Sequence, residues 1–146
     1  MTAISIVDGH LDAVLRGDVA SLPALLTPDF RMYLNDELVA EGRDAAVARL
    51  LPLQRALPRR SLRVHERVAA GDRVRQRWTL DAWPPDQLAS ANAPIRIDGA
   101  SWTVCRDGLV AELYQWFDVA AVRRQLDRLP APLPPCPAAF QRAVAR

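Results

Sequence analysis

Residues 61–83 read SLRVHERVAAGDRVRQRWTLDAW, and this stretch decides the fold class. Both halves alternate apolar and polar residues with the period of two that is typical of a half-buried strand. The pair Gly71-Asp72 between the halves fits a tight turn. The stretch therefore predicts a long antiparallel hairpin.

Two further strands are predicted after this hairpin. Residues 93–105 (APIRIDGASWTVC) and 108–118 (GLVAELYQWFD) are rich in β-branched and aromatic residues, and the turn pair Asp107-Gly108 separates them. Residues 84–94 (PPDQLASANAP) form a longer loop. The second half of the chain thus predicts four consecutive antiparallel strands.

The first sixty residues are predicted to be mainly helical. Apolar residues recur at helical spacing over residues 4–17. The other expected elements are a short helix over 19–26, a strand pair over 29–35 and 38–42, a third helix over 42–57 that Pro52 kinks or interrupts, and a closing helix over 119–129. Helices grouped early and hairpins grouped late indicate an α+β domain over residues 1–129, with a curved sheet folded around the helices. Residues 130–146 form a Pro-rich tail.

The composition excludes several classes of protein. The chain has 146 residues, of which 50% are hydrophobic, and a net charge of +2, with its arginines spread along the chain. A nucleic-acid interface would need a clustered basic stripe. Cys105 and Cys136 do not form a disulfide framework or a metal-ligand motif, which favours a reducing cytoplasm. No signal peptide, membrane span or phosphate-binding loop is predicted.

Alternate residues of a strand face opposite sides of a sheet, so each predicted strand has two sets of residues. We call the mainly apolar set the apolar parity, and the set of polar and aromatic residues the mixed parity. The apolar parity carries Phe30, Met32, Leu34, Val74, Gln76, Trp78, Leu80, Leu113, Gln115 and Phe117. The mixed parity carries Arg31, Tyr33, Asn35, Arg75, Arg77, Thr79, Asp81, Trp83, Glu112, Tyr114, Trp116 and Asp118. Either the mixed parity faces water, or it lines a ligand pocket that combines aromatic walls with a few polar groups. The pattern alone leaves both alternatives open.

The order of elements, with GDVASLPALLTPDF, GRDAAV and AAGDRV at its turns, resembles the nuclear transport factor 2-like superfamily. The resemblance covers roughly residues 4–128. It implies a cone-shaped mixed sheet, mostly antiparallel, around an internal cavity. The small-molecule branches of this superfamily include SnoaL-like polyketide cyclases, ketosteroid isomerases and limonene epoxide hydrolase. The resemblance also implies a homodimer that pairs through the outer face of the sheet.

The stretch MYLN followed by EGRDA resembles limonene epoxide hydrolase more closely. By this resemblance Tyr33 and Asn35 would orient a water or a substrate oxygen, and Arg77 would complete the site. Asp118, which ends WFD, would be the catalytic acid or base that the cyclases share. Thr79 stands where that family needs a second aspartate, so Asp81 or Glu112 would have to replace it.

Asp118 has two alternative roles. It caps the helix that follows, or it lies in an apolar pocket and exchanges protons with a substrate. In the second case, the resemblance and the aromatic residues imply a substrate-binding set of Tyr114, Trp116, Trp78, Trp102, Trp83, Asp81 and Glu112. His10 and His65 lack a metal-ligand pattern, and we expect them to be on the surface or hydrogen-bonded.

The sequence therefore predicts a cofactor-independent cyclase or isomerase of specialised metabolism that binds a small hydrophobic substrate and needs no metal. Because the substrate of a cyclase supplies its own nucleophile, this activity tolerates Thr79 better than hydrolysis does. The alternatives are a limonene-type epoxide hydrolase and a ligand-binding or interaction module without catalysis.

Overall fold

The computed structural model describes residues 1–85 and 94–128 of the chain. Its elements are α1 (Ala3–Arg16), η1 (Leu22–Leu25), β1 (Leu26–Leu34), β2 (Glu37–Glu41), α2 (Arg43–Ala56), β3 (Arg59–Ala70), β4 (Arg73–Trp83), β5 (Ile95–Arg106), β6 (Leu109–Phe117) and α3 (Val119–Asp127). The predicted order of helices and strands is confirmed. The expected Pro-rich tail and most of the 84–94 loop lie outside the described residues.

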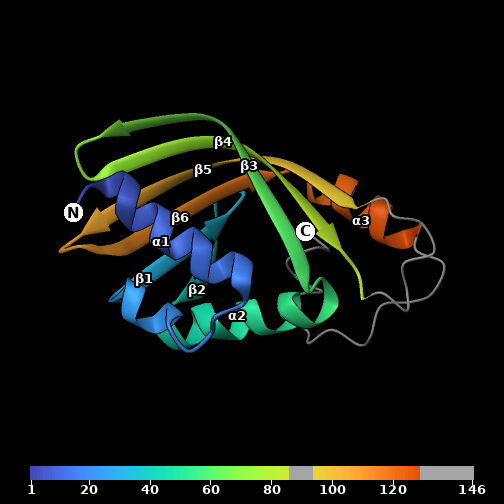
Figure 1. Ribbon diagram of the computed structural model, residues 1–146, viewed down its shortest axis with the longest axis horizontal. Coiled ribbons are helices and arrows are strands. Elements are labelled where there is room, and N and C mark those ends of the chain that lie inside the picture. The colour runs from blue at the N-terminus through green and yellow to red at the C-terminus, as the bar shows by residue number, and fades with distance from the viewer. Residues whose placement is uncertain (86–93, 129–146) are drawn as a thin grey trace.

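Six strands form one curved, unclosed sheet in the order β2-β1-β6-β5-β4-β3 (Figure 1). Four of the five neighbouring pairs are antiparallel, and β1 runs parallel to β6. Because β1 and β6 come from opposite ends of the chain, this pairing joins the N-terminal hairpin to the C-terminal meander. The result is an α+β fold with a mixed sheet, as predicted.

Local sequence signals explain where the elements begin and end. Thr2 caps α1 by accepting a hydrogen bond from the Ser5 amide at 3.1 Å, and Gly17 ends the helix with a left-handed φ of 66°. Asn35 and Asp36 both have positive φ, which suits the tight turn between β1 and β2. Helix α2 continues through Pro52 to Ala56, so the predicted interruption at Pro52 does not occur.

Helices α1 and α2 pack on the concave face of the sheet (Figure 1). Helix α1 contacts β3, β4, β5 and β6, α2 contacts β1 and β2, and α3 packs against β5. Among the described residues, the buried apolar side chains form three clusters, which contain Phe30, Leu57 and Val74 respectively. A core divided in this way leaves room for a cavity between the helices and the sheet.

Candidate functional site

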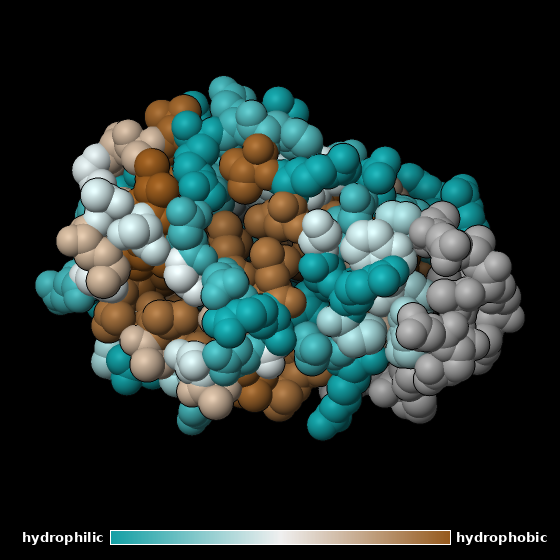
Figure 2. Space-filling view, in the orientation of Figure 1, coloured by the Kyte–Doolittle hydropathy of each residue, from teal (hydrophilic) through white to brown (hydrophobic). Residues whose placement is uncertain are grey.

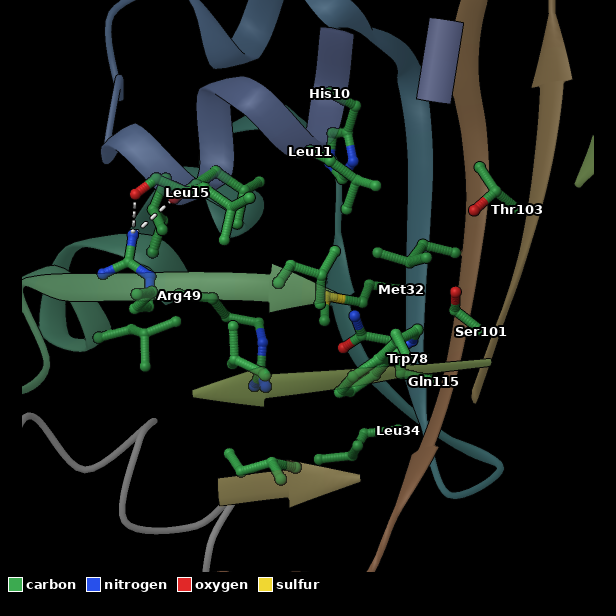
Figure 3. A pocket seen from close by; sticks show the side chains of 18 of the residues that line it. His10, Leu11, Leu15, Met32, Leu34, Arg49, Trp78, Ser101, Thr103 and Gln115 are labelled. Carbon is green, nitrogen blue, oxygen red and sulfur yellow. Dashed lines mark hydrogen bonds between the residues drawn. The ribbon is translucent and has the colours of Figure 1, made fainter. Parts of the chain in front are cut away.

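A cavity of about 230 Å³ lies between the helices and the concave face of the sheet (Figure 3). The strand residues that line it are Phe30, Met32, Leu34, Arg60, Leu62, Gln76, Trp78, Leu80, Ile97, Ser101, Thr103, Leu113, Gln115 and Phe117. On β1, β4 and β6 these residues belong to the apolar parity. Figure 2 shows apolar side chains in a hollow on one face of the molecule, bordered by hydrophilic ones. The alternative in which the mixed parity lines the pocket is therefore wrong.

Five uncharged polar side chains interrupt this apolar lining. They are His10 from α1, Gln76 from β4, Ser101 and Thr103 from β5, and Gln115 from β6. Gln76, Ser101 and Thr103 are each less than 5% exposed. None of the lining residues that the structure describes is an aspartate or a glutamate. The cavity therefore offers hydrogen bonds to a ligand without a carboxylate for acid or base chemistry.

His10 is the one titratable group in the cavity with an ordinary pKa near neutrality. It lies on the buried face of α1 with Val7 and Ala13, and it is 6% exposed. Burial lowers its pKa from 6.5 to about 4, so the imidazole is neutral at pH 7. No described residue hydrogen-bonds its ring. The expectation that His10 is on the surface or hydrogen-bonded is wrong.

Two arginines in the cavity lining have different surroundings. Arg60 donates to the carbonyls of Leu57 at 2.7 Å and of Val14 at 2.5 Å. Its cation is thus held by carbonyl groups at the C-terminal ends of two helices, where the helix dipole favours positive charge. Arg49 on α2 has no hydrogen bond or ion pair with any described residue. Burial lowers the pKa of both guanidinium groups from their usual value.

Aromatic rings form one wall of the cavity. Trp78 is 6% exposed, and its ring centroid lies 6.5 Å from that of Phe117. Gly99 pairs with both residues across the sheet. A Cβ atom at position 99 would lie 2.6 Å from the Trp78 ring, so the glycine provides the space that this ring occupies.

Most of the predicted site residues lie on the opposite face of the sheet. Tyr33 and Tyr114 stack with centroids 4.7 Å apart, and the Tyr114 hydroxyl donates to Glu112 at 2.8 Å. Trp116 stacks next to Tyr114 and donates to Asp36 at 3.1 Å. These residues come together as an aromatic row on the outer face, but they do not line the cavity. Trp78 alone of the predicted set does so.

Asp118 caps α3 and does not face the cavity. Its carboxylate accepts a hydrogen bond from the Ala121 amide at 3.0 Å, and the residue is exposed. Asn35, which was expected to orient water, instead uses its side-chain amide on the backbone of Phe117: its NH2 group donates to the Phe117 carbonyl, and its oxygen accepts from the Phe117 amide. The prediction that Asp118 points into an apolar pocket is wrong, because the strand parity that ends at Asp118 faces outward.

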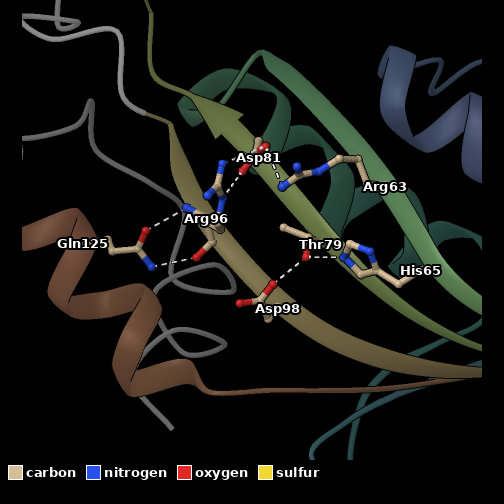
Figure 4. A network of polar contacts seen from close by, with 7 residues as sticks. All are labelled: Arg63, His65, Thr79, Asp81, Arg96, Asp98 and Gln125. Atoms are coloured by element: carbon tan, nitrogen blue, oxygen red, sulfur yellow. Dashed lines mark hydrogen bonds and ion pairs between the residues drawn. The ribbon is translucent and has the colours of Figure 1, made fainter.

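The remaining predicted residues belong to polar contacts on the outer face (Figure 4). Arg77 pairs with Glu66 at 3.6 Å, and both side chains are well exposed. Asp81 pairs with Arg96 at 2.8 Å and with Arg63 at 3.4 Å, which holds the pKa of its carboxyl below the usual value. In the same network Thr79 donates to Asp98 at 2.5 Å and bonds His65 at 2.7 Å.

Two more aromatic residues of the predicted substrate-binding set contact arginines. The Trp83 ring lies under Arg59 at 4.5 Å, and the Trp102 ring lies under Arg73 at 5.9 Å. Such cation–π contacts are common at exposed positions. Neither ring lines the cavity, so the expected role of these two residues in substrate binding has no support from their positions.

The sequence contains a signal for the polar cavity residues, namely polar side chains within otherwise apolar patterns. Gln76 and Gln115 are amides at positions where the neighbouring residues of the same parity are apolar. His10 likewise occupies the apolar face of the helix over 4–17. A polar residue inside an apolar pattern is informative, because its burial costs free energy unless it finds a partner.

The family of the chain follows from comparison of its sequence with known domains. The sequence profile of the SnoaL-like domain matches residues 7–113. The chain belongs to the SnoaL-like domain family. No curated protein sequence matches the chain.

Solved structures share this SnoaL-like fold at low identity. An LEH-like epoxide hydrolase from M. tuberculosis has a TM-score of 0.69 and 20% identity, over 86% of this chain and 90% of that chain. A predicted SnoaL-like polyketide cyclase from Shewanella putrefaciens CN-32 has a TM-score of 0.72 and 14% identity, over 86% and 85%. AclR from Streptomyces galilaeus, a predicted hydroxylase, has a TM-score of 0.70 and 21% identity, over 88% of this chain and 97% of that chain. Other structures with the fold are described as nuclear transport factor 2-like.

Residues 1–85 and 94–128 contain no group of three or more His, Cys, Asp or Glu side chains that could hold a metal ion. None of the described helices is long and apolar enough to cross a membrane.

Proposed function

We propose that this SnoaL-like protein binds a small, largely apolar organic molecule in the cavity between its helices and its sheet. The observation that carries the proposal is the composition of the lining, in which apolar side chains surround a few neutral hydrogen-bonding groups. Ligand pockets have this composition, and most are of similar or larger volume. Binding would bury the apolar body of the ligand, and the polar groups would fix its orientation.

The proposal differs from the catalytic role that the sequence suggested for Asp118. A general acid or base must lie within hydrogen-bond reach of the substrate. Asp118, Arg77, Tyr33 and Asn35 do not line the cavity, and no described carboxylate does. Epoxide hydrolysis would need a group that activates water, so these positions favour binding over hydrolysis.

A second candidate function is a cyclase or isomerase in which His10 accepts the proton. The neutral imidazole in the cavity favours it, because the ring has a free lone pair at pH 7. A pKa of about 4 makes His10 a weak base, so this reaction would need a substrate with an acidic C–H bond. In that case His10→Gln would abolish turnover of the bound compound while binding remains.

The test of the proposed function uses two alanines on α2. Ala46 is buried and lines the cavity, whereas Ala48 is exposed on the same helix. We expect the wild-type protein to bind tetralin, a bicyclic hydrocarbon, in calorimetry. Ala46→Leu should weaken binding strongly because its side chain occupies the cavity, and Ala48→Leu should leave it unchanged. Equal affinity of both variants, with native circular dichroism, would refute binding in this cavity.

A further inference from the structure

Three polar side chains of the cavity form a continuous row across the sheet. Gln76 on β4 pairs with Ser101 on β5, and Ser101 pairs with Gln115 on β6. Neighbouring strands lie about 4.8 Å apart, so these side chains stand next to one another on the concave face. Two residues along each strand, on the same face of the sheet, the neighbouring row holds Trp78, Gly99 and Phe117. The row of Gln76, Ser101 and Gln115 is therefore a polar band beside an aromatic wall.

The amide of Gln76 has a fixed orientation. Its Oε1 accepts a hydrogen bond from Nε of Arg67 at 2.7 Å, and Arg67 also pairs with Asp8 of α1 at 2.9 Å. An arginine can only donate hydrogen bonds, so the oxygen of the amide must face Arg67 and the NH2 group must lie on the other side. The ion pair with Asp8 in turn restrains the guanidinium.

The NH2 group of Gln76 has no acceptor within the described part of the chain. Gln76 is 3% exposed, and no described residue accepts a hydrogen bond from its amide nitrogen. This nitrogen is not one of the fully enclosed side-chain atoms without a partner, so it keeps some open surface at which water or a ligand can accept its hydrogen bond. Because Gln76 lines the cavity, this donor is available to a bound molecule.

The other polar groups do not provide a competing fixed acceptor. Arg49 has only donors and no partner among the described residues. The hydroxyls of Ser101 and Thr103 rotate, and the Gln115 amide has no hydrogen bond that fixes it. Neutral His10 has one donor and one acceptor nitrogen, and no described residue fixes which nitrogen carries the proton. The polarity that the described side chains fix in the cavity is thus that of a hydrogen-bond donor.

We propose that the ligand carries a carbonyl oxygen, as in a cyclic ketone, quinone or ester, that accepts a hydrogen bond from the Gln76 amide. This inference rests on the proposed function and adds the chemical class of the ligand. Arg67 acts as a positioning residue, because it keeps the amide from turning its oxygen toward the ligand.

The test compares tetralin with tetralone, which has the same ring system and one carbonyl. The quantity measured by calorimetry is the ratio of the two Kd values, tetralin over tetralone, in each variant. Comparing ratios between variants cancels the different hydration of the two ligands. We expect Gln76→Met and Gln76→Glu to lower this ratio about two- to tenfold, since each removes one donated hydrogen bond. Gln125→Met, outside the cavity, should leave it unchanged.

A third variant tests the orientation of the amide. Arg67→Met leaves Gln76 in place but frees its oxygen, so we expect the ratio of Kd values to fall although tetralin still binds. A ratio that stays at the wild-type value in both Gln76 variants would overturn the inference, and so would wild-type binding of tetralin without tetralone. Failure of both compounds to bind the wild-type protein would instead refute the proposed function itself.

Discussion

Single residues set the polarity of the cavity, and His10 is the described lining residue that is kept neutral by its burial. Its neighbours on the buried face of α1, Val7 and Ala13, are apolar, and no described carboxylate lines the cavity to stabilise an imidazolium. Protonation therefore opposes folding, because the charged ring would be buried without a partner.

The stability of the protein should depend on pH through His10. Its pKa falls from 6.5 unfolded to about 4 folded, so the unfolded chain binds more protons between these values and stability rises with pH. From pH 7 to pH 4 we expect a loss of roughly 3 kcal/mol in the free energy of unfolding. Urea denaturation at several pH values measures it.

The control variants for this pH dependence are His10→Leu and His65→Gln. His10→Leu should remove most of the loss between pH 7 and pH 4. His65→Gln should retain it, because His65 lies at an exposed position on the outer network. A wild-type slope that survives in His10→Leu would contradict the burial of a neutral imidazole.

Asp118 contributes to stability rather than to the cavity. Asp118→Ala should lower the free energy of unfolding by about 1 kcal/mol, because α3 loses its N-cap hydrogen bond to Ala121. Asp118→Asn should retain most of that stability, since asparagine is also a good N-cap. Both variants should bind tetralin as the wild type does. A loss of ligand binding in Asp118→Asn would contradict the position of Asp118 outside the cavity.

At the scale of the elements, β5 packs closely against both neighbouring strands at Gly99. Gly99→Ala should destabilise the protein by about 1–3 kcal/mol, since the new methyl group would meet the Trp78 ring at 2.6 Å and the Trp116 carbonyl at 2.8 Å. Thermal unfolding measures the change. Gly9→Ala, on an exposed position of α1 with open space around it, should stabilise by up to about 1 kcal/mol. Equal effects of the two substitutions would contradict the packing at Gly99.

The elements could be predicted from the sequence, whereas the direction in which their faces point could not. Alternation in β4 separates Gln76 and Trp78 from Arg77 and Thr79, but either set is compatible with one strand of a curved sheet. The direction depends on where α1 and α2 pack, which is a long-range property. The resemblance assigned the polar set to the cavity, and the packing of the helices on the apolar set reversed that assignment.

At the scale of the whole molecule, the sheet separates two surfaces with different chemistry. The concave side holds the cavity, and the convex side carries the stacked rings of Tyr33, Tyr114 and Trp116. Trp116 is 36% exposed, and Leu38 and Val68 are each 47% exposed. These side chains give the outer face an apolar component that water covers in the monomer.

The homodimer that the resemblance implies stays a prediction for this outer face. We expect sedimentation equilibrium to give twice the chain mass of 16.2 kDa, and Trp116→Arg to shift the equilibrium toward the monomer. Thr103→Val, on the cavity side, is the control that should leave the mass unchanged. A monomeric wild-type protein at all concentrations tested would end this prediction.

The central claim is that a guest molecule occupies the concave side of the sheet, and nuclear Overhauser effects from bound tetralin test it most directly. We predict effects to the methyl groups of Leu50, Leu113 and Val122, which line the cavity, and none to the rings of Tyr33 and Tyr114. Effects confined to those outer rings would contradict the claim.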